Sequence, residues 1–256
     1  MPTVKNIYIL YEKGLDVLAS HVQDALEQML SCFPRYKDNY PIEILGDWKS
    51  DNYSTQRKDG SIMLNAFESA EWYIHRARHK ANLDNRWQKG RQISAEQLWH
   101  DLNDDPYAQK TPQWKLFITK YDMYLPKMPY CMGVTKEDSF SVISTARFLE
   151  KDNQLDLENF KTYIMHEFGH IIHLVPQGRV HTEDNLGPQC TNYGCVMRKI
   201  STLDSEDITQ IRRDRKRYNF SLCCQDCLKA GNAFFAKQQK EYNIAHNIKE
   251  PKKYLL

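Results

Sequence analysis

The run His166-Glu167-Phe168-Gly169-His170 carries more information about this chain than any other stretch. On an α-helix, two histidines four residues apart lie on one face, where both imidazoles can bind a single zinc ion. The glutamate between them then lies beside the metal and can accept a proton from a metal-bound water. Apolar residues recur at helical spacing over residues 157–172, and no proline interrupts the run before Pro176, so we expect a helix here.

The same five residues have a plainer interpretation, because two histidines on a core helix can be buried without any metal. Cysteine spacing further along the chain argues against that interpretation. Two close pairs of thiols, separated by a helical segment, are typical of a closed zinc site with four cysteine ligands, and such a metal supplies folding free energy. The two pairs are Cys190 with Cys195 and Cys224 with Cys227. Cys223 could take the place of Cys224 by a shift of one residue.

Length and composition are those of an ordinary globular protein, since 256 residues suffice for one large domain with a buried core. The net charge of +2 argues against bulk electrostatic binding to nucleic acid or to an anionic membrane. No targeting or transmembrane run is recognisable, and seven cysteines without a signal peptide favour thiols and metal over disulfides. We therefore expect a cytoplasmic protein in which Cys32 and Cys131 are plain core residues.

The N-terminal part has the pattern of a strand, a helix and a second strand, at residues 4–11, 14–33 and 41–46. This order suggests a parallel pair of strands joined by a right-handed crossover. Further strands are expected at residues 114–124, 132–134 and 139–144.

Residues 47–111 differ from their surroundings, because they are polar and rich in Trp, Tyr, Arg and Asp. Helical patterns occur over residues 62–83 and from the capping box Ser94-Ala95-Glu96-Gln97 to residue 102. We expect an insertion on a sheet-based core that forms a lid or wall over a cleft. His75 and His79 lie one turn apart in it, but no nearby acidic residue matches their spacing, which favours a solvated helix face.

With Met197 two residues after Cys195, the chain resembles the archaemetzincins, a group within the metzincin metalloproteases. Their pattern is H-E-x-x-H-x-x-G-x-x-H-C-x4-C-x-M, followed by C-x-x-C. The chain matches it at both ends, at His166, Glu167, His170, Cys190, Cys195, Met197, Cys224 and Cys227. Residues 118–124 and 140–147 also resemble the two strands that precede the active-site helix in that family.

The resemblance implies an α/β fold, with a metzincin-like mixed β-sheet, an active-site helix and a small C-terminal subdomain stabilised by zinc. In a single metallopeptidase domain, residues 1–175 would form the N-terminal subdomain and residues 176–256 the C-terminal one. The resemblance also implies that Met197 lies in a turn beneath the catalytic metal. It places residues 140–144 as the edge strand beside the cleft, where an extended peptide could pair.

The implied function is that of a zinc peptidase with two zinc ions per chain, one catalytic and one bound by the four cysteines. Zinc lowers the pKa of its water to about 7, and Glu167 accepts the proton and passes it to the leaving amine. The expected partner is a peptide or protein substrate, with no nucleic acid and no membrane. The alternative is a zinc-stabilised binding protein whose catalytic site has decayed.

The third ligand of the catalytic zinc is where the chain departs from the family. His173 stands at the position of the family's glycine, and Pro176 stands at the position of its third histidine. A Gly-x-x-His spacing occurs five residues later, from Gly178 to His181, so we expect His181 to be the third ligand. If the helix runs to residue 175, His181 must return about 7 Å over three extended residues, which reach about 10 Å.

Other residues could be the third zinc ligand instead. His173 shares the helix face of the two histidines, but it lies about 10 Å along the axis from His166. Glu183 and Asp184 are further candidates, and the site could also be degenerate. The basic run at 212–217 could bind nucleic acid, although its place at a helix C-terminus favours a solvated helix end.

Overall fold

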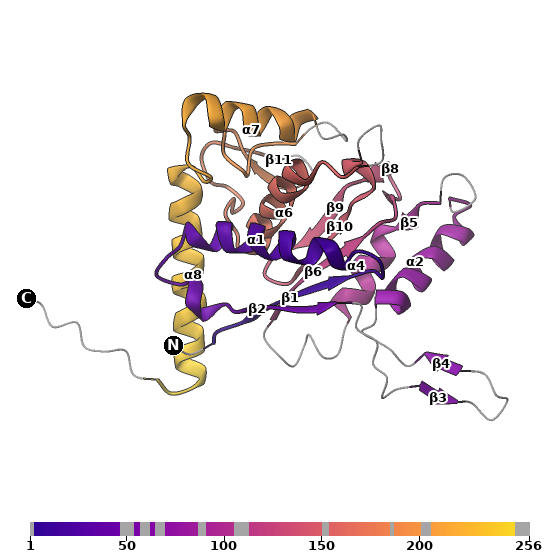
Figure 1. The fold of residues 1–256 in the computed structure, drawn as a ribbon. Helices are drawn as coiled ribbons and strands as arrows, with labels where there is room; N and C mark the ends of the chain where they lie inside the picture. The colour runs from indigo at the N-terminus through magenta and orange to yellow at the C-terminus, as the bar shows by residue number, and fades with distance from the viewer. Residues whose placement is uncertain are drawn as a thin grey trace, which may run out of the picture.

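A mixed sheet of five strands lies at the centre of the computed structural model, with helices against both of its faces (Figure 1). The structure describes residues 3–46, 54–56, 62–64, 70–86, 91–104, 113–149, 154–184, 187–200 and 206–248. Four strands run parallel in the order β2-β1-β6-β10, and β9 completes the sheet antiparallel to β10. The strands are β1 (Asn6–Tyr11), β2 (Ile42–Gly46), β6 (Gln113–Thr119), β9 (Gly133–Lys136) and β10 (Phe140–Ser144).

The predicted strand–helix–strand opening is confirmed. β1 and β2 pair in parallel, with Ile7 opposite Ile42. The helix between them, α1 (Ala19–Ser31), begins later than predicted, because Gly14 has a φ of +89°, outside the right-handed helical region. Two short 3-10 turns flank α1, namely η1 (Asp16–Leu18) and η2 (Lys37–Asn39).

Successive residues of the central strands point to opposite faces of the sheet and so contribute to two separate cores. Ile118 and Ile143 belong to the main core, whereas their neighbours Phe117 and Val142 belong to a second core. The second core is covered by α2 (Ala70–Leu83) and α4 (Ala95–Asn103), which come from the polar segment 47–111. The helices of that segment therefore belong to a hydrophobic core, in addition to their predicted role as a wall over a cleft.

The helix predicted over residues 62–83 forms only in the second part of that range. Ile62–Leu64 forms the strand β4, which pairs with β3 (Ser54–Gln56), and the helix α2 begins at Ala70. The predicted cap of α4 is confirmed, since the Ser94 hydroxyl accepts a hydrogen bond of 3.2 Å from the Gln97 N–H.

The single strand predicted over residues 114–124 is divided into two. β6 ends at Thr119, whose hydroxyl accepts a hydrogen bond from the Tyr121 N–H and so favours a turn over a continued strand. The chain then enters a small sheet of β5 (Ile93–Ser94), β7 (Met123–Leu125) and β8 (Met128–Cys131).

The C-terminal half contributes three helices to the side of the sheet that α1 covers. They are α6 (Leu157–Ile171), α7 (Glu206–Tyr218) and α8 (Gln225–Ala245). The remaining elements are the 3-10 turn η4 (Ala146–Phe148) and the hairpin of β11 (Thr182–Asp184) and β12 (Pro188–Cys190). The Phe235 ring of α8 lies 5.1 Å from the Phe33 ring, centroid to centroid, so the residues after 175 share the main core.

The edge of the sheet corrects one expectation drawn from the resemblance. β10 (Phe140–Ser144) lies inside the sheet, between β6 and β9, so the edge strand is β9 and not residues 140–144. The order of strands in a sheet depends on pairings between distant segments, which a local pattern does not contain.

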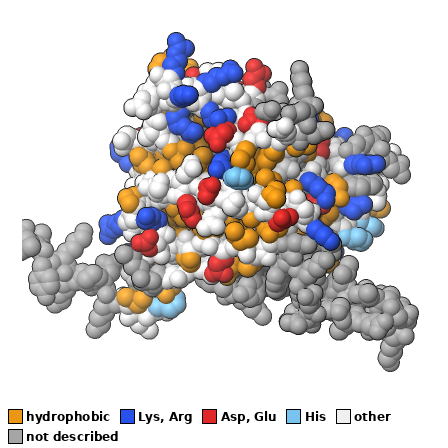
Figure 2. Space-filling model, in the orientation of Figure 1, with side chains coloured by type: hydrophobic (Ala, Val, Ile, Leu, Met, Phe, Trp, Pro, Cys, Tyr) orange, Lys and Arg blue, Asp and Glu red, His pale blue; other side chains and the backbone are white. Residues whose placement is uncertain are grey.

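The basic run lies on α7, where Lys and Arg side chains gather at the top of the view in Figure 2. Arg212 of this run donates to the Asn159 side chain at 2.8 Å and lies 3.4 Å from the Glu158 carboxylate. At least this arginine therefore holds α7 against α6. Among the described residues, no helix has the length and apolar character that crossing a membrane requires.

Candidate active site and metal sites

The two histidines of the motif lie on α6, whose start and end are both fixed by local contacts. The Asp156 carboxylate caps the helix by accepting from the Asn159 N–H at 3.0 Å. The helix ends at Ile171 and does not continue to residue 175, because His173 adopts a left-handed φ of +53°. His173 thus has the backbone conformation that a helix-ending glycine usually provides.

The imidazoles of His166 and His170 converge, with their Nε2 atoms 3.1 Å apart. The Nδ1 of His166 lies 2.9 Å from the Val196 carbonyl, which fixes Nδ1 as the protonated nitrogen and leaves Nε2 with a lone pair. Burial and the neighbouring His166 and His173 lower the pKa of His170 well below its usual value, so this ring is neutral. Two nitrogen ligands on tetrahedral zinc lie about 3.3 Å apart, so the pair fits as two of its ligands.

Met197 lies directly against this part of α6. A Cβ added at Gly169 would lie 2.1 Å from the Met197 sulfur, so any larger residue there would require the Met197 side chain to move. Met197 is fully buried, and its carbonyl accepts from the Cys190 N–H at 2.8 Å. The predicted turn at Met197 therefore packs under the helix beside the histidine pair.

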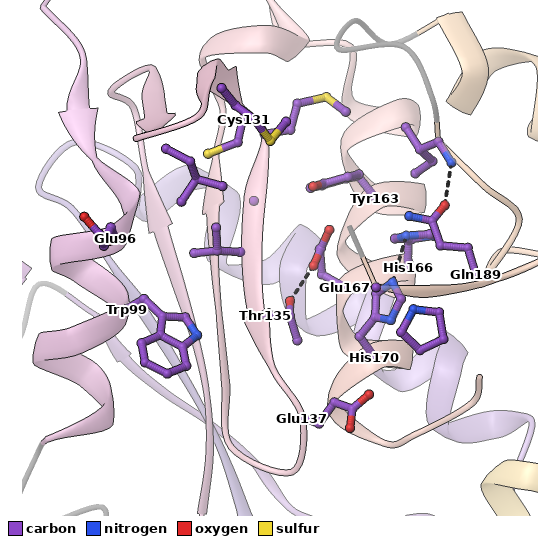
Figure 3. A pocket seen from close by; sticks show the side chains of 18 of the residues that line it. Glu96, Trp99, Cys131, Thr135, Glu137, Tyr163, His166, Glu167, His170 and Gln189 are labelled. Atoms are coloured by element: carbon purple, nitrogen blue, oxygen red, sulfur yellow. Dashed lines mark hydrogen bonds between the residues drawn. The ribbon is translucent and has the colours of Figure 1, made fainter. Parts of the chain in front are cut away.

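Glu167 is a buried carboxylate held between α6 and the edge strand (Figure 3). The Thr135 hydroxyl of β9 donates a hydrogen bond to Glu167 Oε2, and the Ser141 hydroxyl lies 2.8 Å from the Thr135 oxygen. Burial and the adjacent Glu167 carboxylate raise the pKa of Tyr163 well above its usual value, so the tyrosine keeps its proton and donates to Glu167. These contacts fix the carboxylate beside the histidine pair.

A cavity of about 550 Å³ opens in front of these residues. Its walls are α6, with His166, Glu167 and His170, and the edge of β9, with Thr135, along which no described strand pairs. Further walls come from Trp99 and neighbouring residues of α4, which confirms part of the predicted wall, and from the end of β12. The backbone of an extended peptide could pair with β9 in this cavity.

The four predicted cysteines come together, with all their sulfur atoms within 4.8 Å of one another. Cys190 Sγ lies 3.7 Å from Cys224 Sγ, and Cys195 Sγ lies 3.6 Å from Cys227 Sγ. Thiolates on tetrahedral zinc at 2.3 Å are about 3.8 Å apart, so this donor set fits zinc. Within the described part of the chain, this is the one cluster of three or more His, Cys, Asp or Glu side chains that could hold a metal.

Hydrogen bonds among these thiols separate their pKa values. The bond with Cys195 lowers the pKa of Cys190 to about 6, and the bond with Cys190 lowers that of Cys224. Bonds with Cys190 raise the pKa values of both Cys195 and Cys227. The extra cysteine, Cys223, does not belong to the cluster, since its sulfur lies 3.8 Å from the Met29 sulfur in the main core.

His181 lies elsewhere than predicted, because the structure does not bring it to the histidine pair. Its side chain is 63% exposed, and its Nδ1 lies 3.0 Å from Asp226, between the cluster ligands Cys224 and Cys227. The other candidates are also engaged or exposed. His173 stacks on Phe234 and pairs with Glu137 at 3.4 Å, Glu183 pairs with Lys199 at 3.1 Å, and Asp184 is exposed.

Comparison with solved structures supports the fold. The crystal structure of an archaemetzincin from Methanopyrus kandleri superimposes with a TM-score of 0.53 and 17% identity, over 91% of this chain and 96% of that one. This chain has the archaemetzincin fold. An archaemetzincin from Archaeoglobus fulgidus, complexed with malonate, is 19% identical over 88% of this chain and 99% of its own, with a TM-score of 0.44.

A third structure, a zinc-dependent peptidase from Methanocorpusculum labreanum, is 14% identical, with a TM-score of 0.45. It covers 88% of this chain and all of its own. No protein-family model matches the chain, and no curated protein matches it either.

One residue that lines the cavity was not predicted from the sequence. Gln189 is buried and lines the cavity with the histidine pair. In the archaemetzincin pattern, the third histidine directly precedes the first cysteine, and here the residue before Cys190 is Gln189. Counting backwards from the cysteines would have found it, whereas counting forwards from His170 leads to Pro176.

Proposed function

We propose that this chain is a zinc-dependent peptidase that cleaves extended peptides bound along β9. The observation that carries the proposal is the convergence of His166 Nε2 and His170 Nε2 at 3.1 Å, on the wall of a cavity that also holds the buried Glu167. The second metal proposed is a structural zinc on the four-cysteine cluster, which makes two zinc ions per chain.

The residues of the cavity would divide the reaction between them. Zinc bound by His166 and His170 would supply Lewis acidity for a water and for the carbonyl of the scissile bond. Glu167 would accept a proton from the attacking water and return it to the leaving amine. Thr135 and Tyr163 hold the carboxylate of Glu167 in place, which limits the orientations it can adopt before the proton moves.

Substrate would bind along the edge of β9 where no described strand pairs. An extended peptide that adds to this edge forms backbone hydrogen bonds without regard to its side chains, while the cavity walls select among side chains. Trp99 of α4 offers an apolar surface on that wall.

The proposed function is tested with a variant that changes proton transfer alone. Glu167→Gln keeps the shape of the side chain and should lower kcat by at least about 100-fold on a quenched peptide library with excess zinc. Zinc content and melting temperature should stay near those of the wild type, because Glu167 is not a ligand. Cleavage by Glu167→Gln at the wild-type rate would exclude this mechanism.

A second candidate function is a zinc-stabilised binding protein with a degenerate catalytic site. It is favoured by one observation, since no third ionisable ligand joins His166 and His170 among the described residues. The two functions differ in one measurement. Zinc-saturated protein that binds extended peptides but cleaves none of them supports the binding protein.

A further inference from the structure

Gln189 stands directly before Cys190, where the archaemetzincin pattern has its third histidine. This side chain is only 6% exposed and lines the same cavity as His166 and His170. In the view of Figure 3, Gln189 and His166 lie on the same side of the cavity. Gln189 is the middle residue of the short strand β12, next to Cys190, so the cysteine cluster fixes the backbone from which it projects.

The orientation of the Gln189 amide is set by a backbone donor. The Ile200 N–H donates to Gln189 Oε1 at 2.9 Å, so the amide oxygen must face Ile200. The planar amide group then carries its NH₂ on the opposite side of the same carbon. An amide NH₂ is a hydrogen-bond donor and has no lone pair for zinc.

The side chains that could bind zinc at the third position have partners elsewhere. His181 bonds Asp226 beside the cysteine cluster, and Glu183 pairs with Lys199. Two imidazoles alone hold zinc weakly, because catalytic zinc sites use three protein ligands and one open position.

We propose that Gln189 puts a neutral amide at the position of a third metal-binding histidine, so that His166 and His170 form a two-histidine zinc site. This inference rests on the proposed function, in that it places the catalytic metal on this pair. The cysteine cluster then binds zinc far more tightly than the histidine pair does.

The test counts tightly held zinc and needs no catalytic activity. Purified protein is loaded with zinc, treated with a chelator of moderate affinity, and measured by elemental analysis. The wild type should keep one zinc per chain and Gln189→His should keep two, because a third imidazole raises the affinity of the pair by at least about tenfold. His181→Ala and Gln189→Ala should each keep one, as the wild type does.

Two controls decide where the additional zinc binds and whether the variant is folded. Gln189→His combined with His166→Ala should return to one zinc, and circular dichroism should show that Gln189→His is folded. The proposal is overturned if the wild type keeps two zinc ions and His181→Ala loses one, since His181 would then be the third ligand. It is equally overturned if folded Gln189→His keeps only one.

Failure of the proposed function gives a different result. If Gln189→His gains the second zinc but neither protein cleaves peptides with excess zinc, the peptidase proposal fails and the assignment of Gln189 stands. If zinc-saturated wild type cleaves peptides and holds two tight zinc ions, the peptidase proposal stands and the assignment of Gln189 fails.

Discussion

At the scale of single residues, the position of Glu167 depends on the edge strand as well as on its own helix. Thr135 of β9 donates to Glu167, so the strand proposed to bind substrate also orients the base. Thr135→Val keeps the shape of the side chain but removes this donor. It should lower kcat by about 10–100-fold with little change in KM, as measured by steady-state peptide hydrolysis.

Thr135→Ser is the matched control for that variant. It keeps the hydroxyl group that donates to Glu167 and should retain most of the wild-type kcat. If Val and Ser at position 135 give the same kcat, the hydroxyl group does not position the base.

A second residue-scale prediction concerns the backbone of His173. A residue with a Cβ is strained at a φ of +53°, whereas glycine is not. His173→Ala and His173→Gly both lose the contacts of the imidazole with Glu137 and Phe234, so their difference isolates the backbone. The glycine variant should be more stable than the alanine variant by about 1 kcal/mol in urea denaturation. Equal stability would mean that the helix end relaxes without strain, and neither variant should lose zinc.

The sequence predicted the residues whose chemistry follows from local spacing. His166 and His170 converge as expected, because four residues on a helix set their separation. The prediction of His181 as the third zinc ligand rests on counting residues along a loop. In a loop, spacing in sequence does not fix distance in space. Gln189 was not considered, because a neutral amide lacks the chemistry by which a metal ligand is recognised in a sequence.

At the scale of elements, the sequence pattern predicted α1, α4, α6 and the parallel pair of β1 and β2, but not the order of the other strands in the sheet. The strand order that makes β9 the edge arises from contacts between segments far apart in the chain. The sequence also did not predict the second core, because α2 has a largely polar sequence and contributes few residues to it, among them Tyr73 and Ile74.

The segment between α6 and β12 has a role at this scale that the sequence did not indicate, since it packs on the cysteine cluster. Arg179 Nη1 donates to Cys227 Sγ and to the Leu174 carbonyl, each at 3.1 Å. Four thiolates around one zinc carry an excess negative charge, which a guanidinium partly offsets. His181 contacts the same region through Asp226.

Removing the Arg179 guanidinium should therefore weaken the cluster. Arg179→Ala should reduce the zinc affinity of the four cysteines by about 10–100-fold, measured by competition with a strong chelator. Arg213→Ala, which removes an exposed arginine of α7, is the control and should leave the affinity unchanged. If the two variants hold zinc equally well, the contact of Arg179 with Cys227 does not contribute to metal binding.

At the scale of the whole molecule, the cysteine cluster joins the start of α8 to the chain that follows α6. Cys227 lies in the first turn of α8, and Cys190 and Cys195 lie on either side of the turn at β12. Further along α8, a side chain at Gly231 would overlap the Phe33 ring, so this helix packs closely on the main core. Metal bound at one end of α8 would thus stabilise packing between the two halves of the chain.

Loss of the structural zinc should accordingly loosen α8 before it affects the rest of the fold. Cys227→Ser should lose one tightly held zinc and lower the melting temperature by at least about 5 °C. Amide hydrogen exchange should accelerate over Gln225–Ala245, while α2 and α4, which pack on the other face of the sheet, keep their protection. Cys32→Ser, which changes a cysteine outside the cluster, should keep its zinc and its exchange pattern. Uniform acceleration across both cores in Cys227→Ser would show instead that the cluster stabilises the molecule as one cooperative unit.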